Sequence, residues 1–158
     1  MPDWVIKMHI INPRFILCIM RSSYIGIVDT KTFTLHTSSK LLDPSLNDMC
    51  PLSFKRDSLK FALAGSRGLY LLSISDDLAK LSIDEVFFDG KHISTVTLHR
   101  QNEVIATISG KNSLMQVDMG TGGFREIVNP YEQNGKCFYL SVKPVVVEAP
   151  AGETKGVE

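Results

Sequence analysis

The sequence has no surplus of charge of either sign. Its 158 residues contain 17 lysines and arginines and 17 aspartates and glutamates, which gives a formal net charge of zero. A protein that binds nucleic acid through phosphates, or that lies on an anionic membrane, needs an excess of basic residues. The composition therefore argues against a nucleic-acid partner and against a polybasic membrane surface.

Long hydrophobic runs and cysteine motifs are also missing. The longest apolar run, Phe15–Met20, has six residues, whereas a membrane-spanning helix needs about 20. No membrane insertion is expected, and the first residues lack the pattern of a signal peptide. Cys18, Cys50 and Cys137 lie far apart and form no CxxC pair. These features predict a reduced, cytoplasmic protein.

Short apolar segments, each closed by turn-forming residues, predict an all-β fold. Phe15–Met20 stops at Arg21-Ser22-Ser23, and the next segment begins at Tyr24. The one helical candidate, Asp76–Phe88, has no sustained 3.6-residue period. Trp4, the only tryptophan, is expected to pack in the core or between sheets. A β-sandwich and an irregular barrel are the alternative architectures.

A repeated layout of strand, tight turn, strand, polar turn and strand occupies three segments of the chain. The repeats open at Phe15, Phe61 and Val104, at spacings of 46 and 43 residues. A further strand precedes each trio, so each unit has four short strands. A unit of about 40–45 residues with four strands is typical of a β-propeller blade. The spacing therefore predicts a propeller of four-stranded antiparallel blades.

The repeats divide the chain into a propeller-like domain and a tail. The domain is predicted over residues 1–148, with blades at about 4–39, 52–84 and 93–128 and the start of a fourth at 138–148. Residues 42–51 contain two prolines and are interpreted as a connector, and residues 149–158 as a disordered tail. Propellers have about 4–8 blades. The propeller is therefore incomplete or small, and an oligomer or a partner chain that completes it is one prediction.

Two segments resemble the citron homology (CNH) domain family. Ala64–Leu72 (AGSRGLYLL) is similar to the "GT-x-x-GLY" strand pair, and Ile105–Leu114 (IATISGKNSL) to the "ISG-K/R-x-x-x-L" segment. WD40-like blades also carry Gly-x-x-Gly between strands, so the resemblance supports a WD40/CNH-like propeller more than CNH itself. It implies a protein-interaction platform in small-GTPase signalling or vesicle tethering.

No residues of the sequence form a pattern typical of catalysis. The four histidines have no cysteine or carboxylate at zinc-like spacing. The glycine-rich segment Met119–Phe124 is followed by a strand-like sequence instead of the helix of a dinucleotide site. Ser109–Ser113 lacks the upstream glycine of a P-loop. Both are predicted to be turns. We therefore predict no enzyme activity, no cofactor and no metal site.

The predicted partner-binding surface lies on the turns between the second and third strands of the repeats. Blades build a scaffold whose short loops vary freely, which makes these turns candidates for recognition. They contain Arg21, Ser22, Ser23, Ser66, Arg67, Lys111 and Asn112. The sequence thus favours a non-enzymatic protein-interaction scaffold. An assembly subunit completed by a partner chain is one alternative. The other is a metal-dependent propeller hydrolase, with candidate ligands Asp29, Asp76, Asn112 and Asp118.

Overall fold

The described residues of the chain form β-strands and no α-helix. The computed structural model describes residues 4–55, 58–111 and 113–128. No helix in these ranges is long and apolar enough to cross a membrane. The strands are β1 (Val5–Ile10), β2 (Phe15–Met20), β3 (Tyr24–Asp29), β4 (Thr34–Lys40), β5 (Leu46–Lys55), β6 (Ser58–Gly65), β7 (Leu69–Ile74), β8 (Leu81–Phe87), β9 (Ile93–Arg100), β10 (Glu103–Ile108), β11 (Ser113–Asp118) and β12 (Phe124–Val128).

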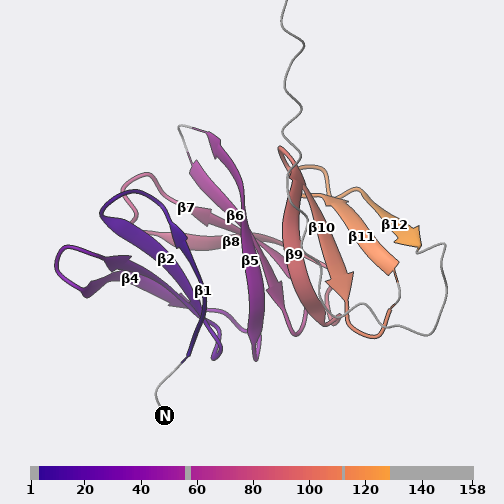
Figure 1. Ribbon diagram of the computed structural model, residues 1–158, viewed down its shortest axis with the longest axis horizontal. Coiled ribbons are helices and arrows are strands. Elements are labelled where there is room, and N and C mark those ends of the chain that lie inside the picture. Colours follow the sequence, from indigo (N-terminus) through magenta and orange to yellow (C-terminus); the bar gives the residue numbers. More distant parts are fainter. Residues whose placement is uncertain (1–3, 56–57, 112, 129–158) are drawn as a thin grey trace, which may run out of the picture.

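The strands pair in chain order into three four-stranded sheets. All pairs are antiparallel, and the sheets are β1–β4, β5–β8 and β9–β12, which we call blades 1, 2 and 3. Figure 1 shows the three blades following one another across the molecule, with β5 of blade 2 beside β9 of blade 3. The fold class predicted from the repeat, all-β with four-stranded antiparallel blades, is confirmed.

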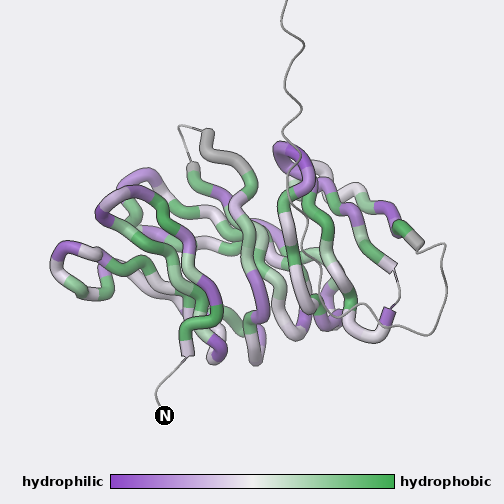
Figure 2. The backbone as a smooth tube through the Cα atoms, viewed as in Figure 1, coloured by the Kyte–Doolittle hydropathy of each residue, from purple (hydrophilic) through white to green (hydrophobic). Residues whose placement is uncertain are grey.

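Apolar side chains from facing sheets hold the blades together. Blade 1 contributes Leu17 and Ile27 to a buried cluster that contains Phe61 and Leu72 of blade 2. The opposite face of blade 2 packs on blade 3 through a second cluster, which includes Ala62. Because blade 2 is covered on both faces, its central strands are nearly continuous runs of apolar residues (Figure 2). Burial of this area is the main favourable contribution to folding.

Asp48, on the innermost strand of blade 2, connects all three blades. Its carboxylate forms an ion pair with Lys7 of β1 and accepts a hydrogen bond from the backbone N–H of Val96 on β9, at 3.0 Å. A carboxylate that is mostly buried needs such partners to offset the loss of hydration. Asp48 therefore fixes the relative positions of the three innermost strands.

The second blade is longer than the sequence predicted. It runs from Leu46 to Phe87 instead of over 52–84, and residues 46–51, expected in a connector, belong to β5. The prediction was wrong because Pro51 suggested a break. Since β5 is the edge strand of its sheet and its pairing is irregular beyond Pro51, a residue without an N–H is tolerated there. Trp4, expected to pack in the core, is 72% exposed.

Several predictions fall on residues that the structure does not describe. These are the start of a fourth blade at 138–148, the tail at 149–158, Cys137 and the candidate site residue Asn112. They stay predictions from the sequence.

Candidate protein-binding groove

The turns predicted to bind a partner lie at one end of the blades, which points downward in Figure 1 and which is named the upper end here. The β2–β3 turn accepts a hydrogen bond at Ser23 O from Leu41 N, at 2.9 Å, in the connection between blades 1 and 2. Ser66 N donates to Ser45 O over 2.9 Å, and Gly90 N to Arg67 O over 2.8 Å. The turns within blades and the connections between blades therefore form one continuous surface.

The predicted residues do not share one environment on this surface. Arg67 is exposed and lines a groove between blades 1 and 2. Arg21 is exposed and lines a second hollow, of about 380 Å³, near the innermost strands. Lys111 pairs with Glu126 across 3.6 Å. Ser23 is 0% exposed, so its side chain cannot contact a partner, while Ser22 is exposed.

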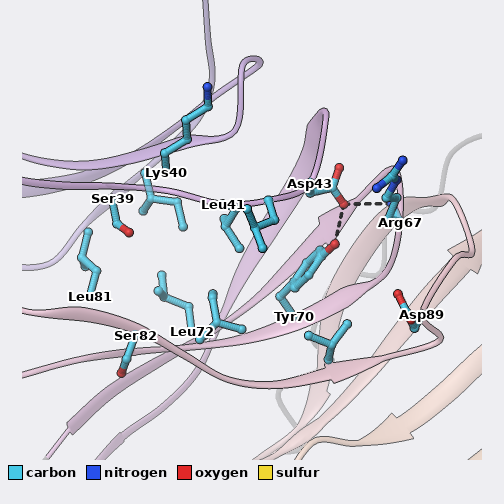
Figure 3. Close-up of a pocket in the computed structure, with 14 residues that line it drawn as sticks. Ser39, Lys40, Leu41, Asp43, Arg67, Tyr70, Leu72, Leu81, Ser82 and Asp89 are labelled. Atoms are coloured by element: carbon cyan, nitrogen blue, oxygen red, sulfur yellow. Dashed lines mark hydrogen bonds between the residues drawn. The ribbon is translucent and has the colours of Figure 1, made fainter.

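The groove lies between the outer strands β4 and β8 and has a volume of about 440 Å³. Figure 3 shows that Leu41 of the connection between the blades and Leu72 and Leu81 of blade 2 line it. Toward the lower end, Thr37 Oγ1 donates to Ala79 O at 3.2 Å and joins the two blades. Toward the upper end the groove reaches the connection between blades 1 and 2. The result is an apolar recess open to solvent.

Exposed apolar side chains stand at the mouth of the groove. Leu42 is 99% exposed, and Val86 is 44% exposed. Both line the groove. Clustered exposed apolar groups beside a recess, with polar groups around them, are typical of a site that binds another molecule. No local pattern of residues indicated this recess, because its walls come from strands about 40 residues apart.

Asp43 organises the upper end of the groove. Its carboxylate accepts hydrogen bonds from Ser66 Oγ at 2.5 Å, Arg67 N at 2.8 Å and Tyr70 Oη at 2.6 Å. The backbone N–H groups of Ser45 and Ser66 donate to it as well, at 2.9 and 3.2 Å. Figure 3 shows two of these bonds converging on the carboxylate. Asp43 thus joins the connection between blades 1 and 2 to the β6–β7 turn.

These donors determine the ionisation of Asp43. Burial raises the pKa of the carboxyl, but the hydrogen bonds from Ser66, Tyr70, Ser45 and Arg67 outweigh it, and the pKa lies below its usual value. Burial and the bond to Asp43 raise the pKa of Tyr70. Asp43 is therefore an anion with its acceptor sites occupied, and its role is to hold the turn that presents Arg67.

One cation and one acid remain at the rim of the groove. In the described part of the chain, Arg67 forms no ion pair, and Asp89 also lines the groove (Figure 3). The side chain of Lys40 points away from the groove. Lys40 pairs with Tyr24 on the face of blade 1 that is turned away from blade 2, and its Nζ lies over the Tyr24 ring, 5.3 Å from the centroid. An incoming carboxylate could bind to Arg67 without breaking an existing ion pair.

A second polar network lies at the inner hollow. Asn47 Nδ2 is 3.1 Å from His92 Nε2 and donates to Ile93 O at 2.7 Å. His92 Nδ1 is hydrogen-bonded to Ser109 Oγ, which is 2.5 Å from Ser94 Oγ. The network joins the first strands of blades 2 and 3 to the β10–β11 turn. These bonds give His92 a structural role.

The candidate metal ligands of the hydrolase hypothesis lie in separate environments. Arg14 holds the pKa of Asp29 at about 2 by hydrogen bonding to its carboxylate, and Asp118 accepts from backbone N–H groups of its own turn. Asp76 is exposed in the β7–β8 turn. Among the described residues, no group of three His, Cys, Asp or Glu side chains could hold a metal ion.

The two described cysteines are buried. Cys18 is 5% and Cys50 is 6% exposed. Burial, with a smaller contribution from Asp48, raises the pKa of Cys50 to about 12. Such a thiol is inert as a nucleophile near neutral pH, and both cysteines pack as small apolar side chains.

Comparison with known proteins identifies the architecture. No protein-family model matches the sequence, and no curated protein matches it. Among solved structures, the chain is similar to the β-propeller domain of Myceliophteria thermophila Cps50 (Swd1), with a TM-score of 0.69 and 16% identity. The chain has the fold of a β-propeller.

The likeness covers 84% of this chain but 46% of the Cps50 chain, so the protein spans about half the length of that relative. The prediction of an incomplete propeller is consistent with this length. The likeness shows the propeller fold and does not distinguish WD40-like blades from CNH blades. The resemblance to CNH domains in particular stays a prediction.

Proposed function

We propose that the protein is a non-enzymatic interaction scaffold that binds an extended segment of a protein partner in the groove between blades 1 and 2. The observation that carries this proposal is the apolar recess of about 440 Å³ with Leu42 and Val86 exposed at its mouth. A recess of this size accommodates a few side chains, and pockets of this kind are mostly apolar with a few polar groups that fix orientation.

The strands beside the groove favour an extended ligand. In the described part of the chain, β4 and β8 each pair with one neighbour only, so each has an edge with unpaired N–H and C=O groups. A peptide can add to such an edge as a further strand and place alternate side chains into an adjacent recess. Arg67, a residue predicted from the sequence that lines the groove, favours a peptide with an acidic residue beside its apolar anchor.

Small-GTPase signalling and vesicle tethering, which the CNH resemblance implies, are finer expectations for the same kind of role. They rest on Ala64–Leu72 and Ile105–Leu114 alone. The cytoplasm remains our proposal for the location, because Cys18, Cys50 and Cys137 lie far apart and form no CxxC pair.

Peptide selection on the purified chain tests the groove. Peptides selected from a random library are expected to contain an apolar residue next to an acidic one. In a heteronuclear NMR titration they are expected to shift the amide signals of residues 39–43 and 81–89. Val86→Glu is expected to weaken binding at least tenfold, because it places a charge at the mouth of an apolar site.

The control is Phe124→Glu, which adds the same charge at a residue of blade 3 that is 64% exposed. It is expected to leave peptide affinity unchanged. Equal binding by the Val86→Glu variant and the wild type, or shifts confined to other parts of the molecule, would contradict the proposal.

A further inference from the structure

The outer face of blade 1, which points away from blade 2, is apolar and exposed. The pairing register places Met8 opposite Cys18, Ile10 opposite Ile16, and Val5 opposite Met20, so these side chains share one face. The same register continues through Gly26 and Val28 of β3 to Leu35 of β4. The exposed members are Val5 (48%), Met8 (63%), Ile10 (68%), Tyr24 (41%) and Leu35 (54%).

This face has the chemistry of a buried one. Strands β1 to β3 contribute no charged side chain to it, and Lys40 stands at its outer upper corner, over the Tyr24 ring. Gly26 lies in the middle, and Leu35 Cδ1 and Met20 Cε come within 2.8 and 3.8 Å of the place that a Cβ would occupy there. The side chains of Leu35 and Met20 therefore fill the centre of the face. An apolar patch of this extent on a soluble protein normally lies against another molecule.

The outer face of blade 3 is different. There Arg125 Nε donates to Gln116 Oε1 and Gln116 Nε2 donates to Glu103 Oε2, both at 2.8 Å. Thr95 and Thr107 lie on the same face of blade 3, and their hydroxyl oxygens are 3.0 Å apart. Covering charged groups with an apolar surface costs hydration that the surface cannot replace. Blade 3 of one molecule is therefore a poor cover for blade 1 of the next.

We propose that the outer face of blade 1 packs on the same face of a second copy of this chain, which gives a dimer with two-fold symmetry. Each copy contributes the outer face of blade 1, on which β1 to β3 place no charged side chain. Because both copies use the same apolar face, the contact is self-complementary. Two sheets packed in this way lie about 10 Å apart with their strands roughly aligned. This proposal concerns a surface other than the groove and goes beyond the scaffold function.

The area of the outer face of blade 1 determines how strongly the two copies are expected to associate. With strands about 4.8 Å apart and about 3.3 Å per residue, four six-residue strands make a face of about 20 by 20 Å. Two such faces bury about 800 Å² before the relief of the side chains is counted, which is below the about 1,000 Å² expected of a stable interface and in the range of weak, transient contacts. We therefore expect a dimer that dissociates on dilution.

Sedimentation velocity and light scattering over a wide concentration range test this. The wild type is expected to move from a monomer of 17.6 kDa to twice that mass as the concentration rises. Met8→Lys, and independently Ile10→Lys, are expected to remain monomeric with an unchanged melting temperature, because both side chains are more than half exposed. Either variant without a folded far-UV spectrum is replaced by the other.

Thr97→Lys is the control that distinguishes the two ways of stacking. Thr97 pairs with Ile105 on the outer face of blade 3, so its lysine variant would break a head-to-tail ring and leave the two-fold dimer intact. A wild type that stays monomeric, a dimer that survives Met8→Lys, or a dimer lost in Thr97→Lys would each overturn the proposal. Peptide binding in the groove is expected to be unchanged by Met8→Lys, so the two proposals can fail separately.

Discussion

Replacing Asp43 by asparagine, which has a side chain of nearly the same size, is expected to destabilise the protein. Asparagine keeps one acceptor oxygen, which can serve the donors of Ser45 and Ser66. Its amide NH₂ then faces the N–H of Arg67 and the hydroxyl of Tyr70, which now donate to the second carboxylate oxygen at 2.8 and 2.6 Å. The Tyr70 hydroxyl can rotate and accept, but the Arg67 N–H has no such freedom.

The size of the effect follows from that unpaired donor. A buried donor left without a partner costs about 1–3 kcal/mol, and a bond to a charged acceptor contributes about 1.5–3 kcal/mol. Because the Arg67 N–H is only partly buried, we expect a loss of about 2 kcal/mol in the free energy of unfolding. For a chain of this length that corresponds to a melting temperature lower by about 4–8 °C.

Urea unfolding, followed by circular dichroism, measures this loss. Asp76→Asn removes the same charge from an exposed turn and is expected to stay within about 0.5 kcal/mol of the wild type. Tyr70→Phe removes one of the five donors, and its cost is expected to be smaller than that of Asp43→Asn. The reasoning is refuted if Asp43→Asn behaves like Asp76→Asn, or if Tyr70→Phe costs more than Asp43→Asn.

Two further predictions follow from the same contacts. Gly65→Ala would push a Cβ into the Asp43 carboxylate and within 2.8 Å of Tyr70 Cε2, so a loss of about 2–3 kcal/mol is expected in urea unfolding; an unchanged midpoint would contradict it. The pKa of Asp29 is about 2 against an ordinary value of 3.8, so its contribution to stability is present above pH 3.8 and is lost as the pH falls toward 2. Arg14→Gln is expected to raise this pKa toward 3.8 in a carboxyl NMR titration, and a pKa that stays near 2 would show that Arg14 is not the cause.

The repeat was predictable because strands and turns are encoded locally. The turn after Ile108 and the glycine-rich turn before Phe124 were predicted from composition alone, and Gly110 and Gly122 there have φ of 83° and 75°, a region that favours glycine. The positions of the strands within each repeat followed from apolar residues bounded by such turns. These features depend on neighbours in the sequence, so one sequence is enough to find them.

The groove and the residue that organises it were not predictable in the same way. Asp43 lies in the sequence Asp-Pro-Ser, which indicates a turn and nothing more. Its partners Ser66 and Tyr70 are 23 and 27 residues away, and they meet it only because β5 pairs with β6 and β6 pairs with β7. Pro51 was misinterpreted for a related reason. Whether a residue without an N–H is tolerated at this position depends on β5 being an edge strand of its sheet.

The chemical difference between the outer faces of blades 1 and 3 limits how many copies of the molecule can associate. If both faces were apolar, each copy could add to the last, and a stack that failed to close would lengthen into a fibre. The bonded polar chain of Glu103, Gln116 and Arg125 makes one end unreceptive, so stacking ends after a single step. A substitution that made this end apolar would therefore be a route to insoluble filaments.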